Sequence, residues 1–186
     1  MRKVVSGLFI SLDGITEGPN IWQETFDEDM GAEMGEFLPT VDTILMGRVT
    51  YQEWQGYWPN MADDAPDGDY ARFVNRTPKY VVSTTLEKAE WGKFDPPTLI
   101  KGNLVEKIIK LKKQPGKNIS VQGSPGLVNS LLQHDLLDEL TLYIHNVVAY
   151  NGKPLFAQGA LKRLDLVEAK STRSGIVIAK YQPRKS

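Results

Sequence analysis

The segment Thr43-Ile44-Leu45-Met46-Gly47-Arg48-Val49-Thr50-Tyr51 contains an apolar run, a glycine, an arginine and then the start of a helical pattern. The run Thr43–Met46 is short and apolar, which is typical of a strand buried on both faces. The residues Val49–Tyr57 are predicted to form a helix. A buried strand that passes directly into a helix is the repeating unit of a parallel α/β sheet. This segment therefore indicates the fold class.

The same order of strand and helix recurs on both sides of this segment. Further strands are predicted at Val4–Leu12, Tyr80–Ser83, Ile119–Gln122 and Leu140–Val148, and further helices at Asp27–Leu38, Leu104–Lys113 and Gly126–His134. Arg163–Thr172 and Ile176–Tyr181 are predicted to form a closing hairpin, and Trp58–Asp69 a polar surface loop or flap. We therefore expect one α/β domain over residues 1–186, with a mostly parallel sheet, helices on both faces and an antiparallel hairpin at the C-terminal edge.

Composition restricts the possible partners. The chain has 186 residues, 41% hydrophobic and 24% charged, which is ordinary for a soluble protein with its own core. The net charge of −1 gives no attraction toward nucleic acid or an anionic membrane. There is no cysteine and there are only two histidines, so we expect no metal site. Asp13 interrupts the first apolar run, which argues against a signal peptide, and we expect a cytoplasmic protein.

Two predicted strand ends carry residues suited to a nucleotide. In open α/β sheets, ligands bind beyond the carboxyl ends of the strands. Gly47 permits close approach to the backbone, Arg48 offers a planar cation that suits the 2′-phosphate of NADP, and Thr50 stands at a helix start. Ser83 and Thr84 place hydroxyl groups after the next strand, where they suit a phosphate or a ribose.

A third strand end precedes the helix at Gly126–His134. Gly123 and Gly126 permit close backbone approach on either side of Ser124, and the helix start would face a pyrophosphate. Each of the three sites alone also fits ordinary caps and turns. Together, with an arginine at one of them, they favour a nucleotide site. The sequence contains neither the G-x-G-x-x-G fingerprint nor a P-loop.

Five motifs follow one another along the chain: Ser11-Leu12-Asp13-Gly14, Gly47-Arg48-Val49-Thr50-Tyr51, Val81-Val82-Ser83-Thr84-Thr85, Gln122-Gly123-Ser124 with Leu127, and Asp138-Glu139-Leu140. Taken together, they resemble the dihydrofolate reductase superfamily, in particular the branch related to the reductase domain of the riboflavin-biosynthesis deaminase–reductase. The resemblance implies a three-layer fold, NADPH as cofactor and a homodimer formed through the final strands. The segment His145–Gly152 departs from the proline and Gly-x-Gly that relatives often carry there.

The resemblance also implies which residues contact the cofactor. They are Gly47, Arg48 and Thr50 at the phosphates near the adenosine, Ser83 and Thr84 at the 2′-phosphate ribose, Gly123, Ser124 and Leu127 at the pyrophosphate, and Gly14 and Ile15 near the nicotinamide.

Hydride transfer to a C=N or C=O bond also needs a proton, and two acidic residues are candidate donors. Asp13 ends the first strand, although its side chain could instead hydrogen-bond the following turn. Asp27 lies five residues after Trp22, although it also fits an acidic helix start. His145 shares a strand face with Tyr143, which favours packing or an interface over catalysis.

The sequence thus leaves three functions open. The favoured one is an NADPH-dependent reductase of a pterin, a pyrimidine or a similar planar heterocycle, resembling dihydrofolate reductase and 5-amino-6-(5-phosphoribosylamino)uracil reductase. The second is an NADP(H)-binding, non-catalytic or regulatory dimer of the same fold. The third is a structural dimer without a nucleotide.

Overall fold

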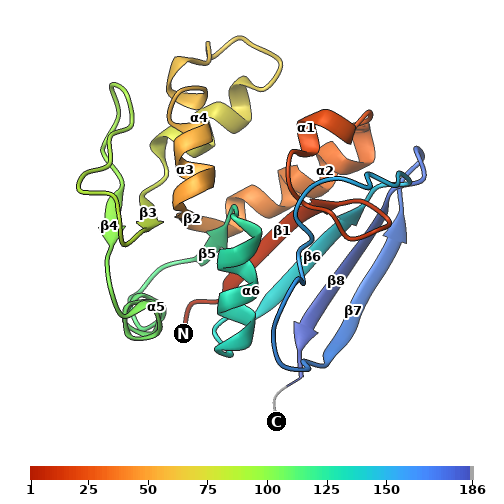
Figure 1. Ribbon diagram of the computed structural model, residues 1–186. Coiled ribbons are helices and arrows are strands. Elements are labelled where there is room, and N and C mark those ends of the chain that lie inside the picture. Colours follow the sequence, from red (N-terminus) through yellow and green to blue (C-terminus); the bar gives the residue numbers. More distant parts are fainter. Residues whose placement is uncertain (185–186) are drawn as a thin grey trace.

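A computed structural model describes residues 1–184, in which eight strands form one sheet with the order β4-β3-β2-β5-β1-β6-β8-β7 (Figure 1). The strands are β1 (Val4–Ile10), β2 (Val41–Gly47), β3 (Lys79–Val82), β4 (Thr98–Ile100), β5 (Asn118–Val121), β6 (Glu139–Ile144), β7 (Leu164–Ser171) and β8 (Val177–Pro183). The first six strands in this order, from β4 through β3, β2, β5 and β1 to β6, are parallel to one another. Strand β8 runs antiparallel to β6, and β7 antiparallel to β8. The mostly parallel sheet with a C-terminal hairpin is therefore confirmed.

Helices cover both faces of the sheet (Figure 1). They are α1 (Pro19–Trp22), α2 (Glu28–Phe37), α3 (Arg48–Trp54), α4 (Gly68–Arg76), α5 (Leu104–Lys112) and α6 (Pro125–Gln133), with short 3-10 turns at Leu38–Thr40 and Trp58–Asn60. Within residues 1–184, no helix combines the length and the apolar character that crossing a bilayer requires.

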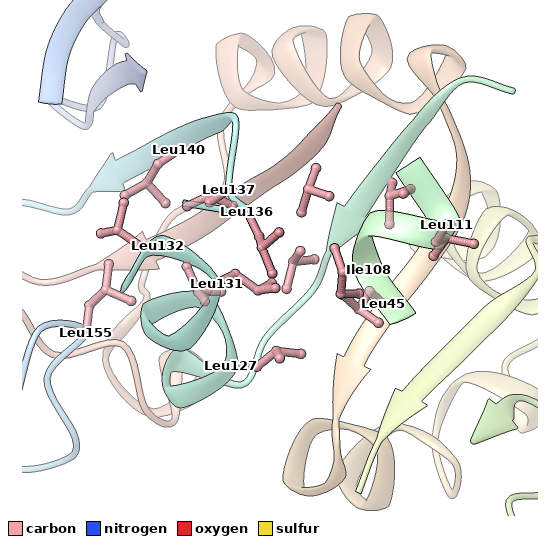
Figure 2. Packing of buried hydrophobic residues seen from close by; sticks show 14 of the residues in the cluster. Leu45, Ile108, Leu111, Leu127, Leu131, Leu132, Leu136, Leu137, Leu140 and Leu155 are labelled. Atoms are coloured by element: carbon pink, nitrogen blue, oxygen red, sulfur yellow. The ribbon is translucent and has the colours of Figure 1, made fainter. Parts of the chain in front are cut away.

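Strand β2 shows how one apolar run supplies two cores, because successive side chains of a strand point to opposite faces. Leu45 packs in the same cluster as Ile108 of α5 and Leu127 of α6 (Figure 2). Ile44 packs on the opposite face, in a cluster with Val74 of α4. Both strand residues are fully buried, which explains the continuous apolar run in the sequence.

Several elements differ from the sequence prediction. The predicted strand Leu140–Val148 ends at Ile144, because the following residues fold over the end of β1, where Val147 accepts a hydrogen bond from the Leu12 N–H (2.8 Å). The predicted loop Trp58–Asp69 contains a 3-10 turn and leads into α4, a helix that was not predicted. Strand β4 was also missed, because it has only three residues and follows two prolines.

Candidate functional site

The predicted site residues lie along one edge of the sheet. Strands β3, β2, β5, β1 and β6 are parallel neighbours, so their carboxyl ends meet at the same edge. Ser83, Gly47, Gly123, Asp13 and His145 follow or end these strands in that order across the sheet. The edge therefore divides into two sides, with β3, β2 and β5 on one and β1 and β6 on the other.

The junctions β2–α3 and β5–α6 are packed against each other through their glycines. The Gly47 N–H donates to the Gly123 carbonyl at 2.9 Å. A Cβ atom on Gly47 would lie 2.6 Å from the Ser124 Oγ, and one on Gly123 would lie 2.9 Å from the Thr50 Oγ1. Gly123 also has a φ of +112°, which side chains rarely adopt. The structure thus brings Gly47, Thr50, Gly123 and Ser124 together.

The start of α6 faces the same edge. Ser124 precedes the helix without a side-chain hydrogen bond to it, and Pro125 occupies the first helical position. Gly126 is exposed, and a Cβ atom added to it would meet nothing within 4 Å. Leu127 is buried in the core, and its N–H donates to the Ser124 carbonyl (2.9 Å). The positive end of the helix dipole and the free space at Gly126 suit an anion.

Arg48 and Ser83 leave adjacent strands, because Gly47 and Val82 are register partners. The Arg48 side chain is exposed, and its Nη1 donates to the Gln52 Oε1 (2.7 Å) one turn further along α3. The buried Ser83 Oγ accepts from the N–H groups of Thr85 (3.2 Å) and Leu86 (3.0 Å) and so stabilises its own turn.

Thr84, the second predicted residue of that turn, is exposed. Because the Ser83 hydroxyl already has local partners, Arg48 and Thr84 are the polar side chains of this part of the edge best placed to meet a ligand in solvent.

Gly14 and Ile15 form a turn that is tied to the loop after β6. Gly14 has a φ of +85°, and its carbonyl accepts from the Leu155 N–H (3.0 Å). Ile15 is buried and forms an isolated antiparallel bridge with Pro154. The backbone of this turn therefore lies at the end of β1, next to the end of β6.

Asp13 fastens the same turn to the same loop. Its carboxylate accepts hydrogen bonds from the Ser11 Oγ (2.6 Å), the Ala149 N–H (3.0 Å) and the Tyr150 N–H (2.8 Å). The Ser11 hydroxyl lowers the pKa of Asp13 most, the two backbone donors lower it further, and partial desolvation opposes them. A general acid must carry its proton near the working pH. These contacts thus favour the turn-residue interpretation, and the donor role stays a prediction.

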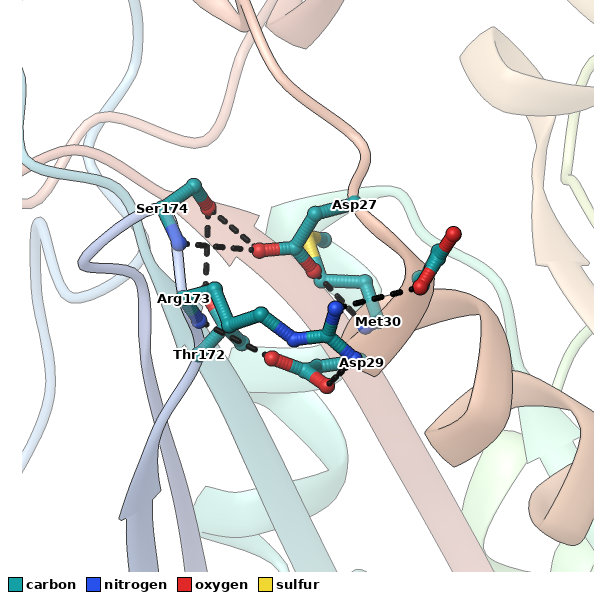
Figure 3. A network of polar contacts seen from close by, with 7 residues as sticks. Asp27, Asp29, Met30, Thr172, Arg173 and Ser174 are labelled. Carbon is teal, nitrogen blue, oxygen red and sulfur yellow. Dashed lines mark hydrogen bonds and ion pairs between the residues drawn. The ribbon is translucent and has the colours of Figure 1, made fainter.

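Asp27 joins the start of α2 to the turn between β7 and β8 (Figure 3). Its carboxylate accepts from the Met30 N–H (2.9 Å), the Ser174 Oγ (2.6 Å) and the Ser174 N–H (3.1 Å). The Ser174 hydroxyl is the main cause of a pKa well below the usual range. Beside it, Arg173 forms ion pairs with Glu28 and Asp29. The helix-start interpretation accounts for these contacts, and a catalytic role for Asp27 stays a prediction.

An aromatic group covers the sheet on the β1 and β6 side. Phe9 of β1 contacts Tyr143 and the half-exposed Phe26 edge to face, at centroid distances of 5.4 and 6.4 Å. The ring of His145 packs against Phe9 and against Trp22, each at 5.5 Å. Flat rings that stand at a strand end are suited to contact a planar ligand.

His145 packs among these rings, as the sequence predicted, and it also carries a polar atom that the packing leaves unused. It directly follows β6, is 3% exposed, and its N–H donates to the Ile10 carbonyl (2.8 Å). Its Nε2 is buried and has no hydrogen-bond partner among the described residues. Burial lowers the pKa of His145, so the imidazole is neutral near pH 7. The sequence placed His145 inside the predicted strand Leu140–Val148, so its position at the strand end appears only in the structure.

The chain is similar to known proteins both in its sequence and in its fold. A family model described as the RibD C-terminal domain matches residues 2–178. The uncharacterized protein YyaP of Bacillus subtilis (strain 168) is 34% identical over 183 residues, which cover 97% of this chain and 94% of that protein. Among solved structures, a putative riboflavin biosynthesis protein from Shewanella sp. PV-4 has a TM-score of 0.79 at 20% identity, covering 98% of this chain and 99% of that chain.

Two further structures have the same fold. The diaminohydroxyphosphoribosylaminopyrimidine deaminase/5-amino-6-(5-phosphoribosylamino)uracil reductase of Thermotoga maritima has a TM-score of 0.68 at 12% identity, covering 98% of this chain and 57% of that chain. Dihydrofolate reductase from Enterococcus faecalis, in complex with NADP(H) and RAB-propyl, has a TM-score of 0.61 at 10% identity, covering 98% of this chain and 97% of that chain.

Proposed function

Because the chain belongs to the RibD C-terminal domain family, we propose that it is an NADPH-dependent reductase of a planar heterocycle, such as a pterin or a pyrimidine. The observation that carries the proposal is the contact between the junctions β2–α3 and β5–α6, where Gly47 and Gly123 leave no room for a side chain. Glycines that let two backbones and a helix start meet at a strand end are suited to hold a pyrophosphate.

The residues at this edge fit NADPH. The start of α6 and the open space at Gly126 would hold the pyrophosphate. The exposed Arg48, with Thr84 after the adjacent strand, would bind the 2′-phosphate that distinguishes NADPH from NADH. The turn at Gly14 and Ile15 would lie against the nicotinamide, which supplies a hydride when it is bound. The complex of the Enterococcus faecalis enzyme with NADP(H) supports this choice of cofactor.

The aromatic side of the edge supports a planar substrate. Phe9 near the end of β1 contacts Phe26 and His145, and Trp22 contacts His145, which directly follows the neighbouring strand β6. Stacking on such rings favours flat heterocycles. The name of the Thermotoga maritima protein, a reductase of a substituted uracil, supports a pyrimidine as one substrate class.

A second function, an NADP(H)-binding protein without efficient catalysis, is favoured by one observation. Both candidate acids, Asp13 and Asp27, have lowered pKa values because several hydrogen-bond donors stabilise their carboxylates. A reductase therefore needs another proton source, such as a bound water.

Titration and turnover test the proposal. We expect NADPH to bind, measured by quenching of protein fluorescence, and NADH to bind more weakly. Oxidation of NADPH in the presence of dihydrofolate or of 5-amino-6-(5-phosphoribosylamino)uracil would establish the reductase. Binding of NADPH without oxidation by any planar heterocycle would favour the second function, and absence of NADPH binding would refute both.

A further inference from the structure

The imidazole of His145 combines burial with an unused hydrogen-bonding atom. The residue is 3% exposed, and its Nε2 contacts no donor or acceptor within residues 1–184. Leaving a buried polar atom without a partner costs about 1–3 kcal/mol. Pure packing would be served equally well by an apolar aromatic residue, so the structure gives the polar atom no use in the protein alone.

The position of the ring points to a ligand. His145 directly follows β6, and its backbone N–H is bonded to Ile10 at the end of β1, so it lies at the edge where open sheets bind ligands. In its neutral form, Nε2 is either a donor or an acceptor, depending on the tautomer. A neutral imidazole among aromatic rings suits the uncharged polar edge of a heterocycle better than it suits a phosphate or a carboxylate.

One of the two rings packed on His145 is weakly held. Trp22 packs edge to face on the His145 ring, and its Nε1 donates to the Glu17 carbonyl (3.1 Å). Trp22 ends α1, a helix of four residues with none buried. Ile21 beside it is 84% exposed. A segment with so little buried surface can move at low cost.

We propose that the Nε2 of His145 hydrogen-bonds the polar edge of the substrate heterocycle, and that Trp22 moves off the imidazole when the heterocycle binds. This inference rests on the proposed function for the class of substrate, but it concerns the β1 and β6 side of the edge, away from the residues proposed to hold the adenosine half of NADPH. It makes His145 a substrate-binding residue and Trp22 a mobile cover.

The two histidines allow a direct test in the full-length protein. His134 is exposed at the end of α6 and serves as the internal control for His145. With ¹⁵N-labelled histidine, and with His134→Gln to assign the signals, dihydrofolate and 5-amino-6-(5-phosphoribosylamino)uracil are added separately to the protein, both without and with NADPH. We expect one of them to shift the His145 signal and to leave the His134 signal in place.

Matched variants separate hydrogen bonding from packing. His145→Phe keeps an aromatic ring and should bind NADPH unchanged, but should bind the heterocycle about tenfold more weakly, which corresponds to one uncharged hydrogen bond. His145→Gln, which keeps a donor and an acceptor, should bind the heterocycle more tightly than His145→Phe. The change in tryptophan fluorescence on heterocycle binding should disappear in Trp22→Phe and persist in Trp54→Phe.

The outcomes distinguish this inference from the proposed function. Equal heterocycle affinity in His145→Phe and the wild-type protein would overturn it. So would a His145 signal that neither heterocycle moves while NADPH binds, and the cofactor proposal would then still stand. A protein that failed to bind NADPH but showed the His145 shift would refute the proposed function and support this inference.

Discussion

Arg48 carries its guanidinium in solvent at the end of β2, bonded only to Gln52 of its own helix among the described residues. Nothing in the fold needs this charge, so its removal should affect binding and leave stability unchanged. A charge-assisted contact to a phosphate is worth about 1.5–3 kcal/mol. We expect Arg48→Ala to weaken NADPH binding by roughly 10- to 100-fold and NADH binding much less.

Fluorescence titration with both cofactors measures this difference. Arg163→Ala is the matched control, because Arg163 is also exposed but lies just before β7, on the side of the sheet where the parallel strands begin. Equal binding of NADPH and NADH by the wild-type protein would contradict the assignment of Arg48 to the 2′-phosphate.

The lowered pKa of Asp27 should make the free energy of unfolding depend on pH. Because its hydrogen bonds lower its pKa in the folded state, the unfolded chain takes up the proton first as the pH falls. Its contribution is therefore complete above the ordinary value of 3.8 and is lost as the pH falls through the folded-state pKa. Asp27→Asn should be less stable than wild type at about pH 7, and the difference should shrink by about pH 3.

Urea unfolding at the two pH values measures the effect. A difference that stayed constant would contradict the contribution of the Asp27 charge. A fall in kcat of about 10²–10⁴-fold at unchanged stability would instead assign Asp27 as the proton donor.

For Asp13, which follows the end of β1, a substitution can likewise separate a structural role from a role as proton donor. Its carboxylate holds Ala149 and Tyr150 with two oxygens, and an asparagine has only one acceptor oxygen. We expect Asp13→Asn to lower the melting temperature and raise KM, because the loop beside His145 loosens. A loss of about 10²–10⁴-fold in kcat with the melting temperature unchanged would show that Asp13 is the acid.

At the scale of elements, replacement of glycine by alanine should have opposite effects on the free energy of unfolding at Gly47 and at Gly126. Gly47→Ala places a Cβ atom 2.6 Å from the Ser124 Oγ and 3.1 Å from its backbone nitrogen, so β2 and the start of α6 must separate. We expect a loss of about 1–3 kcal/mol in the free energy of unfolding and weaker NADPH binding.

Gly126→Ala is the matched control, because its Cβ atom meets nothing within 4 Å. It should leave the free energy of unfolding unchanged or raise it by up to about 1 kcal/mol, since alanine favours the helix. If the pyrophosphate lies against the start of α6, however, the added methyl group would still weaken NADPH binding. Unfolding curves and cofactor titration separate the two effects, and tight NADPH binding by Gly126→Ala would argue against that location.

The elements that the sequence predicted well are those in which one short pattern determines the structure. The run Thr43–Met46 is apolar because both faces of β2 are covered, and the ends of two strands are marked by Gly47, the last residue of β2, and Gly123, which follows β5. Helix α4 was missed although Tyr70, Phe73 and Val74 have helical spacing, because the preceding polar run dominated the interpretation. The contacts of Asp13 and Asp27 join segments more than 130 residues apart, and no local pattern encodes such pairs.

At the scale of the molecule, the structure narrows the homodimer that was expected through the final strands to one of them, β7. The apolar residues Leu140, Leu142, Ile176 and Ile178, in or next to the final strands, are buried in the cores of one chain, so they cannot pair subunits. The exposed surface belongs instead to β7, which forms the edge of the sheet (Figure 1) and is exposed from residue 165 to residue 171. An unpaired edge strand is a template for another chain.

The apolar side chains of β7 make the dimer testable. Leu166 is 57% exposed and Val167 is 53% exposed. We expect the wild-type protein to sediment as a dimer at micromolar concentration, and Val167→Lys to sediment as a monomer, because a charge on an edge strand prevents pairing.

Since Val167 is half-exposed, its replacement should change the free energy of unfolding of the subunit by only about 0.5 kcal/mol. Leu161→Lys, at a position that is 79% exposed and outside β7, should remain dimeric. A wild-type monomer at that concentration would contradict the dimer, and a dimeric Val167→Lys would move the interface away from β7.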